Sequence, residues 1–104
     1  MTEVGERLVA ELDEQGVEYI FGYPGGRVIE ILDHVPDYDL TMVRPRDERE
    51  ASVMAEMHGR LTGSPGVLAG QGPWIGSLGA IGQMEGYLAS SPMVAITEAS
   101  ERGE

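Results

Sequence analysis

Segments typical of helices and of strands alternate along this chain, and a glycine or proline stands at nearly every junction between them. Apolar residues at helical spacing predict four helices, at about 2–15, from after Gly26 to near Pro36, at 47–62 and at 75–88. Short apolar runs predict four strands, at 17–21, 40–43, 66–70 and 93–97. Because helix-length segments separate successive strands, the strands should be parallel, with right-handed crossovers. The predicted fold class is α/β, a three-layer arrangement of a parallel sheet flanked by helices.

Two of the predicted helices carry clear end signals. Thr2 can cap the first helix and Gly16 can end it. Asp47 stands where the third helix needs an N-cap, and Glu50 three residues later completes a capping box. The apolar stripe expected for this helix consists of Ala51, Met54, Ala55, His58 and Leu61. Glu48 is left at the first helical position, where on spacing alone its simplest role is to complement the helix dipole.

Length and composition limit what these elements can build. The chain has 104 residues, 41% of them hydrophobic and 24% charged, which indicates one small globular domain over residues 1–104. A domain of this size buries only about two-thirds of the surface that its unfolded chain exposes, so a partner surface would add stability. Four parallel strands also make a thin sheet. The domain is therefore expected to be an incomplete part of something larger.

The charge excludes several classes of partner. The formal net charge is −11, from 18 acidic and 7 basic residues, and no basic cluster interrupts it. Nucleic acids and anionic membranes would be repelled. The chain contains no cysteine, which excludes disulfides and thiolate chemistry, and it shows neither a signal-peptide pattern nor a membrane-spanning apolar run. We expect a cytoplasmic protein with no nucleic-acid or membrane partner.

Three loops could hold chemistry, because ligands of open parallel sheets bind beyond the carboxyl ends of the strands. These loops follow the first three predicted strands and cover residues 22–26, 44–48 and 70–76. All three should emerge at one edge of the sheet, with Glu48 between two glycine-rich loops. Each glycine loop taken singly is also compatible with ordinary turn chemistry.

Other familiar sites are absent or weak. Gly70, Gly72 and Gly76 are one residue too widely spaced for a dinucleotide fingerprint, and the chain has neither a Walker phosphate loop nor a nucleophile elbow. His34 lies near acidic residues, but His58 falls on an apolar helix face, so no metal site is predicted in this chain. Trp74 is interpreted as a packing or interface residue.

Several sequence blocks occur together in a recognisable order. They are Phe21-Gly22-Tyr23-Pro24-Gly25-Gly26, then Glu48-x-x-Ala51-x-x-Met54-Ala55, then Arg60-x-Thr62-Gly63-x-Pro65-Gly66-Val67, with Met93-Val94-Ala95-Ile96-Thr97 near the end. Over roughly residues 2–99 the chain resembles the N-terminal pyrimidine-binding domain of thiamine-diphosphate enzymes of the acetolactate synthase group. The resemblance implies a truncated version of that domain.

The resemblance also implies a site. In that family a glutamate, matched here by Glu48, hydrogen-bonds N1′ of the aminopyrimidine and promotes loss of the thiazolium proton, after which a 2-oxo acid is attacked. Glu48 is thus the expected catalytic residue of a thiamine-diphosphate-dependent lyase or transferase. The expected cofactor-binding residues, Glu48 included, are Tyr23, Pro24, Gly25, Gly26, Glu48, Gln71, Gly72 and Pro73.

Departures from the family pattern leave alternatives open. Asp47 replaces a frequent histidine, Ser77 replaces an asparagine, and the chain has no Gly-Asp-Gly motif for a magnesium-bound diphosphate. Mg²⁺ would have to be held by a partner domain in a homo- or hetero-oligomer. The first hypothesis is therefore a half-site that needs a diphosphate-binding partner. The alternatives are a non-catalytic interaction domain and a truncated product that keeps the fold without activity.

Overall fold

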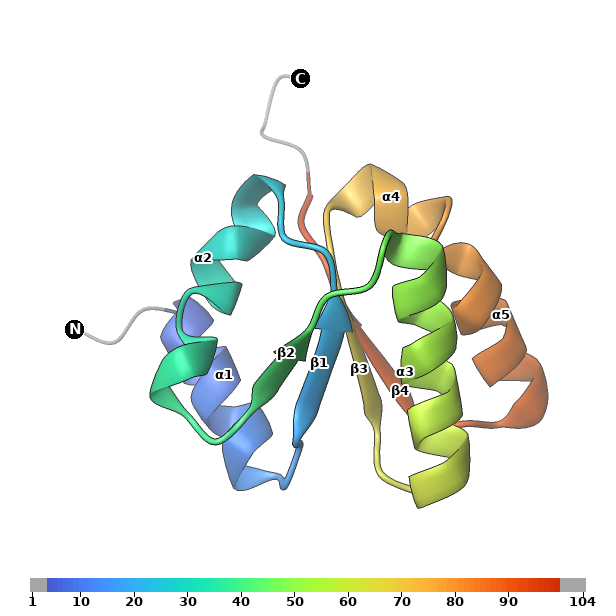
Figure 1. Cartoon of the computed structure of the whole chain (residues 1–104), viewed down its shortest axis with the longest axis horizontal. Helices are drawn as coiled ribbons and strands as arrows, with labels where there is room; N and C mark the ends of the chain where they lie inside the picture. The colour runs from blue at the N-terminus through green and yellow to red at the C-terminus, as the bar shows by residue number, and fades with distance from the viewer. Residues whose placement is uncertain (1–3, 100–104) are drawn as a thin grey trace.

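A parallel sheet lies between two layers of helices in the computed structural model, which describes residues 4–99 (Figure 1). Its strands are β1 (Tyr19–Gly22), β2 (Thr41–Val43), β3 (Gly66–Ala69) and β4 (Met93–Ile96), in the order β2-β1-β3-β4. All three pairings are parallel. The predicted α/β class and three-layer architecture are confirmed.

Helices of different lengths cover the two faces of the sheet (Figure 1). One layer contains α1 (Val4–Glu14), α2 (Ile29–Leu32) and the short 3₁₀ turns η1 (Gly26–Val28) and η2 (Val35–Asp37). The other layer contains α3 (Glu48–Thr62), α4 (Gly72–Gly76) and α5 (Ala80–Ala89). Among residues 4–99, no helix is both long and apolar enough to cross a membrane.

The core is divided between the two faces because successive strand residues point to opposite sides. Ile20 packs with Val9 and Val67 in the cluster under α1 and α2. Its neighbour Phe21 packs instead with Leu68 and with alanines of α3. The two clusters hold the sheet from both sides and leave the carboxyl ends of the strands accessible to the loops.

Two predicted helices are broken in the structure. The segment after Gly26 forms η1, α2 and η2 in place of one helix, and Pro36 stands inside η2. The segment predicted as one helix over 75–88 is split between α4 and α5 at residues 77–79. There the Ser77 hydroxyl donates to the Pro73 carbonyl (2.6 Å), a local hydrogen bond that competes with helix continuation. The predicted Thr2 cap lies outside the described residues.

The predicted apolar stripe of α3 was partly wrong. Ala51 and Ala55 are fully buried, but Met54 and Leu61 are exposed, and Ser52 and Glu56 are buried in their place. The reason is that α3 is covered on two sides, by the sheet and by α5. Gly82 of α5 donates its backbone N–H to the Ser52 hydroxyl (3.0 Å).

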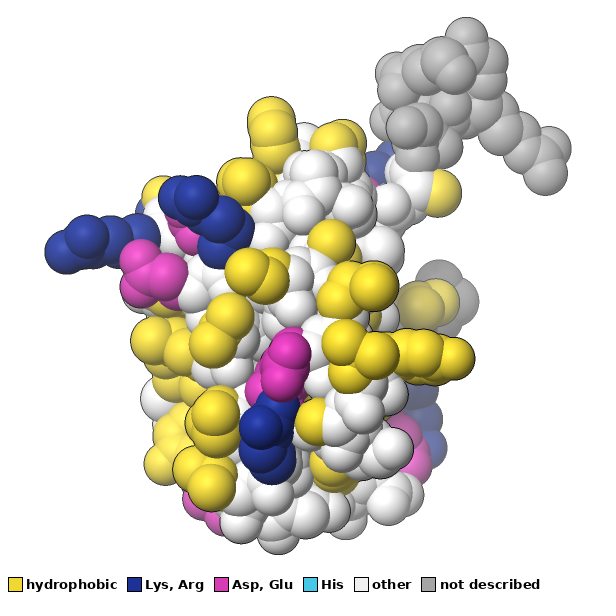
Figure 2. Space-filling model, turned by 90° about the vertical axis from the view of Figure 1, so that its right-hand side faces the viewer, with side chains coloured by type: hydrophobic (Ala, Val, Ile, Leu, Met, Phe, Trp, Pro, Cys, Tyr) yellow, Lys and Arg dark blue, Asp and Glu magenta, His cyan; other side chains and the backbone are white. Residues whose placement is uncertain are grey.

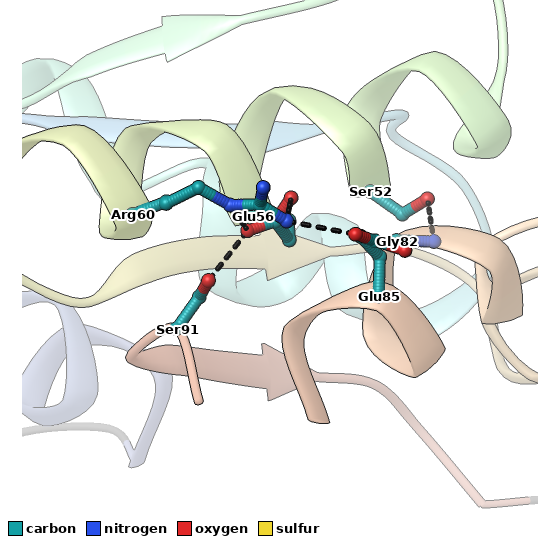
Figure 3. A network of polar contacts seen from close by, with 6 residues as sticks. All are labelled: Ser52, Glu56, Arg60, Gly82, Glu85 and Ser91. Atoms are coloured by element: carbon teal, nitrogen blue, oxygen red, sulfur yellow. Dashed lines mark hydrogen bonds and ion pairs between the residues drawn. The ribbon is translucent and has the colours of Figure 1, made fainter. Parts of the chain in front are cut away.

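A polar network joins α3 to α5 and to the segment before β4 (Figure 3). Arg60 makes two hydrogen bonds to Glu56 (2.9 and 3.0 Å) and a third to Glu85 of α5 (2.9 Å). The Ser91 hydroxyl donates to the Glu56 carboxylate. Each charge or hydroxyl in this network therefore has a partner, which is what allows Glu56 to be buried.

This network predicts a loss of stability in acid. The Ser91 hydrogen bond and then Arg60 hold the pKa of Glu56 below its ordinary value of 4.5. A carboxyl whose folded-state pKa is lowered stabilises the fold above its unfolded-state pKa, and the contribution disappears as pH falls through the lowered pKa. The melting temperature of the wild type should fall more steeply in this acid range than that of Glu56→Gln. Exposed Glu50→Gln is the control; equally steep curves for all three proteins would contradict the prediction.

Candidate functional site

A cavity of about 350 Å³ opens at the carboxyl ends of the strands. Three loops from different parts of the chain build it: the loop after β1, the start of α3 and the loop after β3. The residues that line it are Tyr23, Pro24, Glu48, Gln71, Trp74 and Leu78. Pockets of this size can enclose most of a small ring compound, so this is the candidate ligand site among the described residues.

Glu48 is placed at the cavity by the cap of α3. The Asp47 carboxylate accepts hydrogen bonds from the backbone N–H groups of Arg49 (2.9 Å) and Glu50 (3.3 Å), so the helix begins at Glu48. Arg49 also pairs with Asp47 through its side chain, and this pairing lowers the pKa of Asp47. The predicted N-cap is confirmed. Asp47, which replaces a histidine frequent in the family pattern, caps the helix.

Glu48 is mostly buried, and its carboxylate has no recorded partner among the described residues. Only 7% of this residue is exposed. Within residues 4–99 the structure records neither a hydrogen bond nor an ion pair for its carboxylate. No fully buried side-chain oxygen or nitrogen of the described residues lacks a partner, so the carboxylate oxygens of Glu48 keep some exposed surface, and they keep it at the cavity that this residue lines. The geometry therefore favours a ligand that brings a hydrogen-bond donor into the cavity.

The loop after β1 forms one wall and is held from two directions. The Tyr23 backbone N–H donates to the Ala69 carbonyl (3.2 Å), and the Arg44 guanidinium lies 4.7 Å from the centre of the Tyr23 ring. Gly26 has φ +53°, a conformation that favours glycine. The backbone N–H of Arg27, the next residue, donates to the Glu98 carboxylate. Gly25 and Gly26 thus shape the loop but do not line the cavity.

The loop after β3 forms the opposite part of the lining. Gln71 accepts a hydrogen bond from the Trp74 indole N–H (3.1 Å), and both residues line the cavity. Gly72 and Pro73 form the first turn of α4 and lie outside the lining. Of the eight predicted cofactor-binding residues, the structure brings Tyr23, Pro24, Glu48 and Gln71 to the cavity.

Sequence reasoning missed four contributors. Trp74 and Leu78 line the cavity, Arg44 covers the Tyr23 ring, and Glu98 holds the loop after β1. For Trp74 a signal existed, since this aromatic residue stands within a glycine loop at the ligand-binding edge. For Glu98 no local signal existed, because its contact joins segments 71 residues apart.

Neither histidine contributes to a metal site in the described structure. His58 packs against the rings of Tyr19 and Phe21, with centroids 5.7 Å apart in each case. Over residues 4–99 there is no group of three or more His, Asp or Glu side chains that could hold a metal ion. Any metal chemistry at this cavity would depend on residues from elsewhere.

Known proteins match the chain over nearly its whole length. Residues 2–104 match the family model described as thiamine pyrophosphate enzyme, N-terminal TPP binding domain. The chain is 38% identical over 94 residues to acetolactate synthase of Bacillus subtilis and 41% identical over 95 residues to the acetolactate synthase large subunit of Haemophilus influenzae. Each of these matches covers 88% of this chain and 16% of the relative. The chloroplastic acetolactate synthase of Arabidopsis thaliana is 39% identical over 92 residues, covering 86% of this chain and 14% of that protein. The chain thus spans a small part of the length of these relatives.

Proposed function

Because the chain belongs to the thiamine pyrophosphate enzymes, as their N-terminal TPP binding domain, we propose that it forms the pyrimidine-binding half of a thiamine diphosphate site in an acetolactate synthase-like enzyme. The observation that carries this proposal is Glu48, a residue only 7% exposed that lines the cavity and whose carboxylate has no recorded partner within residues 4–99. Such a group suits a ring nitrogen that must share a proton. Glu48 would be the catalytic residue.

In this proposal the residues of the chain bind and orient the aminopyrimidine ring of the cofactor. When bound, thiamine diphosphate supplies a thiazolium carbon that, once deprotonated, attacks the carbonyl of a 2-oxo acid. Glu48 would share a proton with N1′ of the aminopyrimidine, and its mostly buried position would strengthen that hydrogen bond. Tyr23, Pro24 and Gln71 line the cavity around Glu48 and would orient the ring.

A second domain must hold the diphosphate. The residues that the structure describes contain no acidic cluster suited to Mg²⁺, so we assign Mg²⁺ and the diphosphate to a partner domain in a homo- or hetero-oligomer. Exposed hydrophobic side chains support such a partner, since they gather on the face of α3 and α5 (Figure 2). They include Val53, Met57, Ile81, Met84, Tyr87 and Leu88.

Reconstitution tests this proposal. The chain is mixed with a separately expressed diphosphate-binding chain that carries a Gly-Asp-Gly motif, and binding of thiamine diphosphate with Mg²⁺ is followed by calorimetry. Release of carbon dioxide from a 2-oxo acid is followed in parallel. We expect tight cofactor binding and turnover in the mixture and no turnover from either chain alone. A stable mixture with neither cofactor binding nor turnover would contradict the proposal.

Substitutions can test whether the exposed apolar face of α3 and α5 binds the partner. Leu88 is 74% exposed on α5, whereas Val4 is 86% exposed on α1 in the opposite helix layer. Leu88→Glu should weaken association with the diphosphate-binding chain about tenfold or more, since it places a charge in an apolar contact. Val4→Glu should leave association unchanged, as measured by the same calorimetric titration. Equal affinities for the two variants would mean that the partner binds to another face of the domain.

A non-catalytic interaction domain is the second candidate. It is favoured by the exposed face of α3 and α5 and by Asp47 and Ser77, whose recorded contacts are local to their own helices. A truncated product that keeps the fold would behave in the same way. Partner binding with no heat from thiamine diphosphate, in the presence of Mg²⁺, would support this candidate over the catalytic one.

A further inference from the structure

Strand β4 forms one end of the sheet, and its outer edge is open among the described residues (Figure 1). Its inner edge is bonded to β3, because the carbonyls of Pro92 and Ile96 accept hydrogen bonds from backbone N–H groups at the start and just past the end of β3 (3.0 and 3.1 Å). Backbone polar groups alternate between the two edges of a strand. The N–H and C=O groups of Met93, Ala95 and Thr97 therefore point outward, where they form a template for another strand.

The sequence around β4 lacks the charges that usually protect an edge strand. Natural edges are blunted by charged side chains or covered by another segment. Residues 61–97 contain a single charged residue, Glu85, and its carboxylate is paired with Arg60 of α3 (2.9 Å). The other edge strand, β2, is flanked by Asp39 and Arg44. Of the two edges of the described sheet, β4 is therefore the one that can accept a strand without burying a charge.

A hollow of about 260 Å³ lies beside the open edge, between β4 and α5. Gly86 and Ala95 line it with little side-chain volume, whereas Tyr87, which also lines it, is 83% exposed. The edge thus carries both a recess and a large projecting side chain. A contact in which each copy supplies both features is self-complementary about a twofold axis.

The distribution of charge identifies the occupant of this edge. The chain has a net charge of −11, yet all its charged residues except Glu85 lie outside residues 61–97. Glu98, which follows Thr97, is engaged with the loop after β1 through the backbone N–H of Arg27. A basic partner would therefore gain no new ion pair along β4 and α5. A second copy of this chain meets no unpaired like charge there, brings the same open strand, and satisfies both edges at once.

We propose that β4 pairs with β4 of a second copy in antiparallel orientation, which joins two four-stranded sheets into one. The outward-facing residues are symmetric about Ala95, so Ala95 faces its own counterpart and Met93 faces Thr97 across the twofold axis. Strands of this length make few backbone hydrogen bonds, and contact of Tyr87 with the hollow of the other copy supplies further interface. This inference goes beyond the proposed function, because the pairing needs neither a cofactor nor the cavity at the carboxyl ends of the strands.

Sedimentation of the chain alone, without cofactor or diphosphate-binding chain, tests the pairing. The mass should rise from one copy to two as protein concentration increases. Association should strengthen between about 0.1 and 1 M salt, since salt screens the repulsion between two chains of like net charge. A single-copy mass up to about 1 mM, where even weak dimers are half formed, overturns the inference. A dimer that salt dissociates overturns it as well, because ionic contacts would then hold the two copies together.

Amide hydrogen exchange locates the interface. At concentrations where the mass doubles, the outward N–H of Ala95 should become protected, whereas the N–H of Val94, which faces β3, should be protected at every concentration. A dimer that leaves the Ala95 N–H as exchangeable as in the monomer overturns the inference, since the copies would then meet elsewhere.

Substitutions on the two edge strands provide a matched comparison. Ala95→Lys places two positive charges opposite each other across the twofold axis, so association should weaken about tenfold or more, even though the net negative charge is lower. Thr41→Lys puts the same charge at an exposed position of β2 and should not weaken association. Circular dichroism establishes that each variant is folded. Unchanged association of a folded Ala95→Lys, or equal weakening by both variants, overturns the inference. Failure of the cofactor reconstitution would contradict the proposed function and leave these results unaffected.

Discussion

Glu48→Gln should make the isolated chain more stable while it removes the activity of the reconstituted complex. Only 7% of Glu48 is exposed and its carboxylate has no recorded partner within residues 4–99, so although its oxygens keep some surface at the cavity, it loses part of its hydration, at a cost toward the lower end of about 1–3 kcal/mol. Its position in the first turn of α3 recovers only about 0.3–1 kcal/mol from the helix dipole. The desolvation cost is larger, so a neutral amide should raise the melting temperature. Turnover should fall about a hundredfold or more, because a glutamine amide cannot take up and release a proton at N1′ as a carboxylate can.

Glu50→Gln is the matched control for this prediction. Glu50 lies in the same first turn of α3 but is exposed. Its substitution removes only the favourable dipole interaction, so the melting temperature should fall slightly and turnover should not change. If Glu48→Gln lowered the melting temperature as much as Glu50→Gln does, the cavity would not hold a destabilising carboxylate. If turnover survived, Glu48 would not be the catalytic residue.

If Glu48 serves a ligand site, its substitution should raise stability and lower activity. A group placed for ligand binding can lower the free energy of unfolding of the ligand-free protein, and the bound ligand raises that free energy again.

The helices and strands were largely predictable because their signals are local. Asp47 caps α3 and Gly63 ends it in a left-handed conformation, as capping chemistry indicates. The breaks within the second and fourth predicted helices depend on short-range competition, such as the Ser77 hydroxyl against the helix ladder. The burial of Ser52 and Glu56 could not be predicted, because it depends on which helix covers α3. Periodicity along one helix does not contain that information.

The sequence was sufficient to predict which loops form the candidate site, but not which side chains line the cavity. Parallel topology places the segments after β1, β2 and β3 at one edge, and that alone brings Tyr23, Glu48 and Gln71 together. Whether Gly25, Gly72 or Trp74 faces the cavity depends on backbone torsions in loops of a few residues. The place of Trp74 in the lining needed the structure, since its hydrogen bond to Gln71 and its half-exposed indole are properties of the folded loop.

Gly82→Ala should destabilise the fold more than any other single methyl addition on α5. An added Cβ would lie 2.2 Å from the backbone carbonyl carbon and oxygen of Ser52, so α5 would have to move away from α3. Overpacking of this kind should cost about 3 kcal/mol, which in a domain of this size lowers the melting temperature by roughly 12–24 °C. The Ser52 hydrogen bond to the Gly82 N–H would be lost in the same movement.

Gly76→Ala provides the comparison, because an added Cβ there meets no atom within 4 Å among the described residues. It should change the melting temperature by only a few degrees, and alanine in a helical position can even raise it. Thermal unfolding followed by circular dichroism measures both variants. If Gly82→Ala unfolded at the same temperature as Gly76→Ala, the close approach of α3 and α5 would not hold in solution. The position of Glu48 against the loop after β3 would then lose its support, because the same helix α3 carries both Ser52 and Glu48.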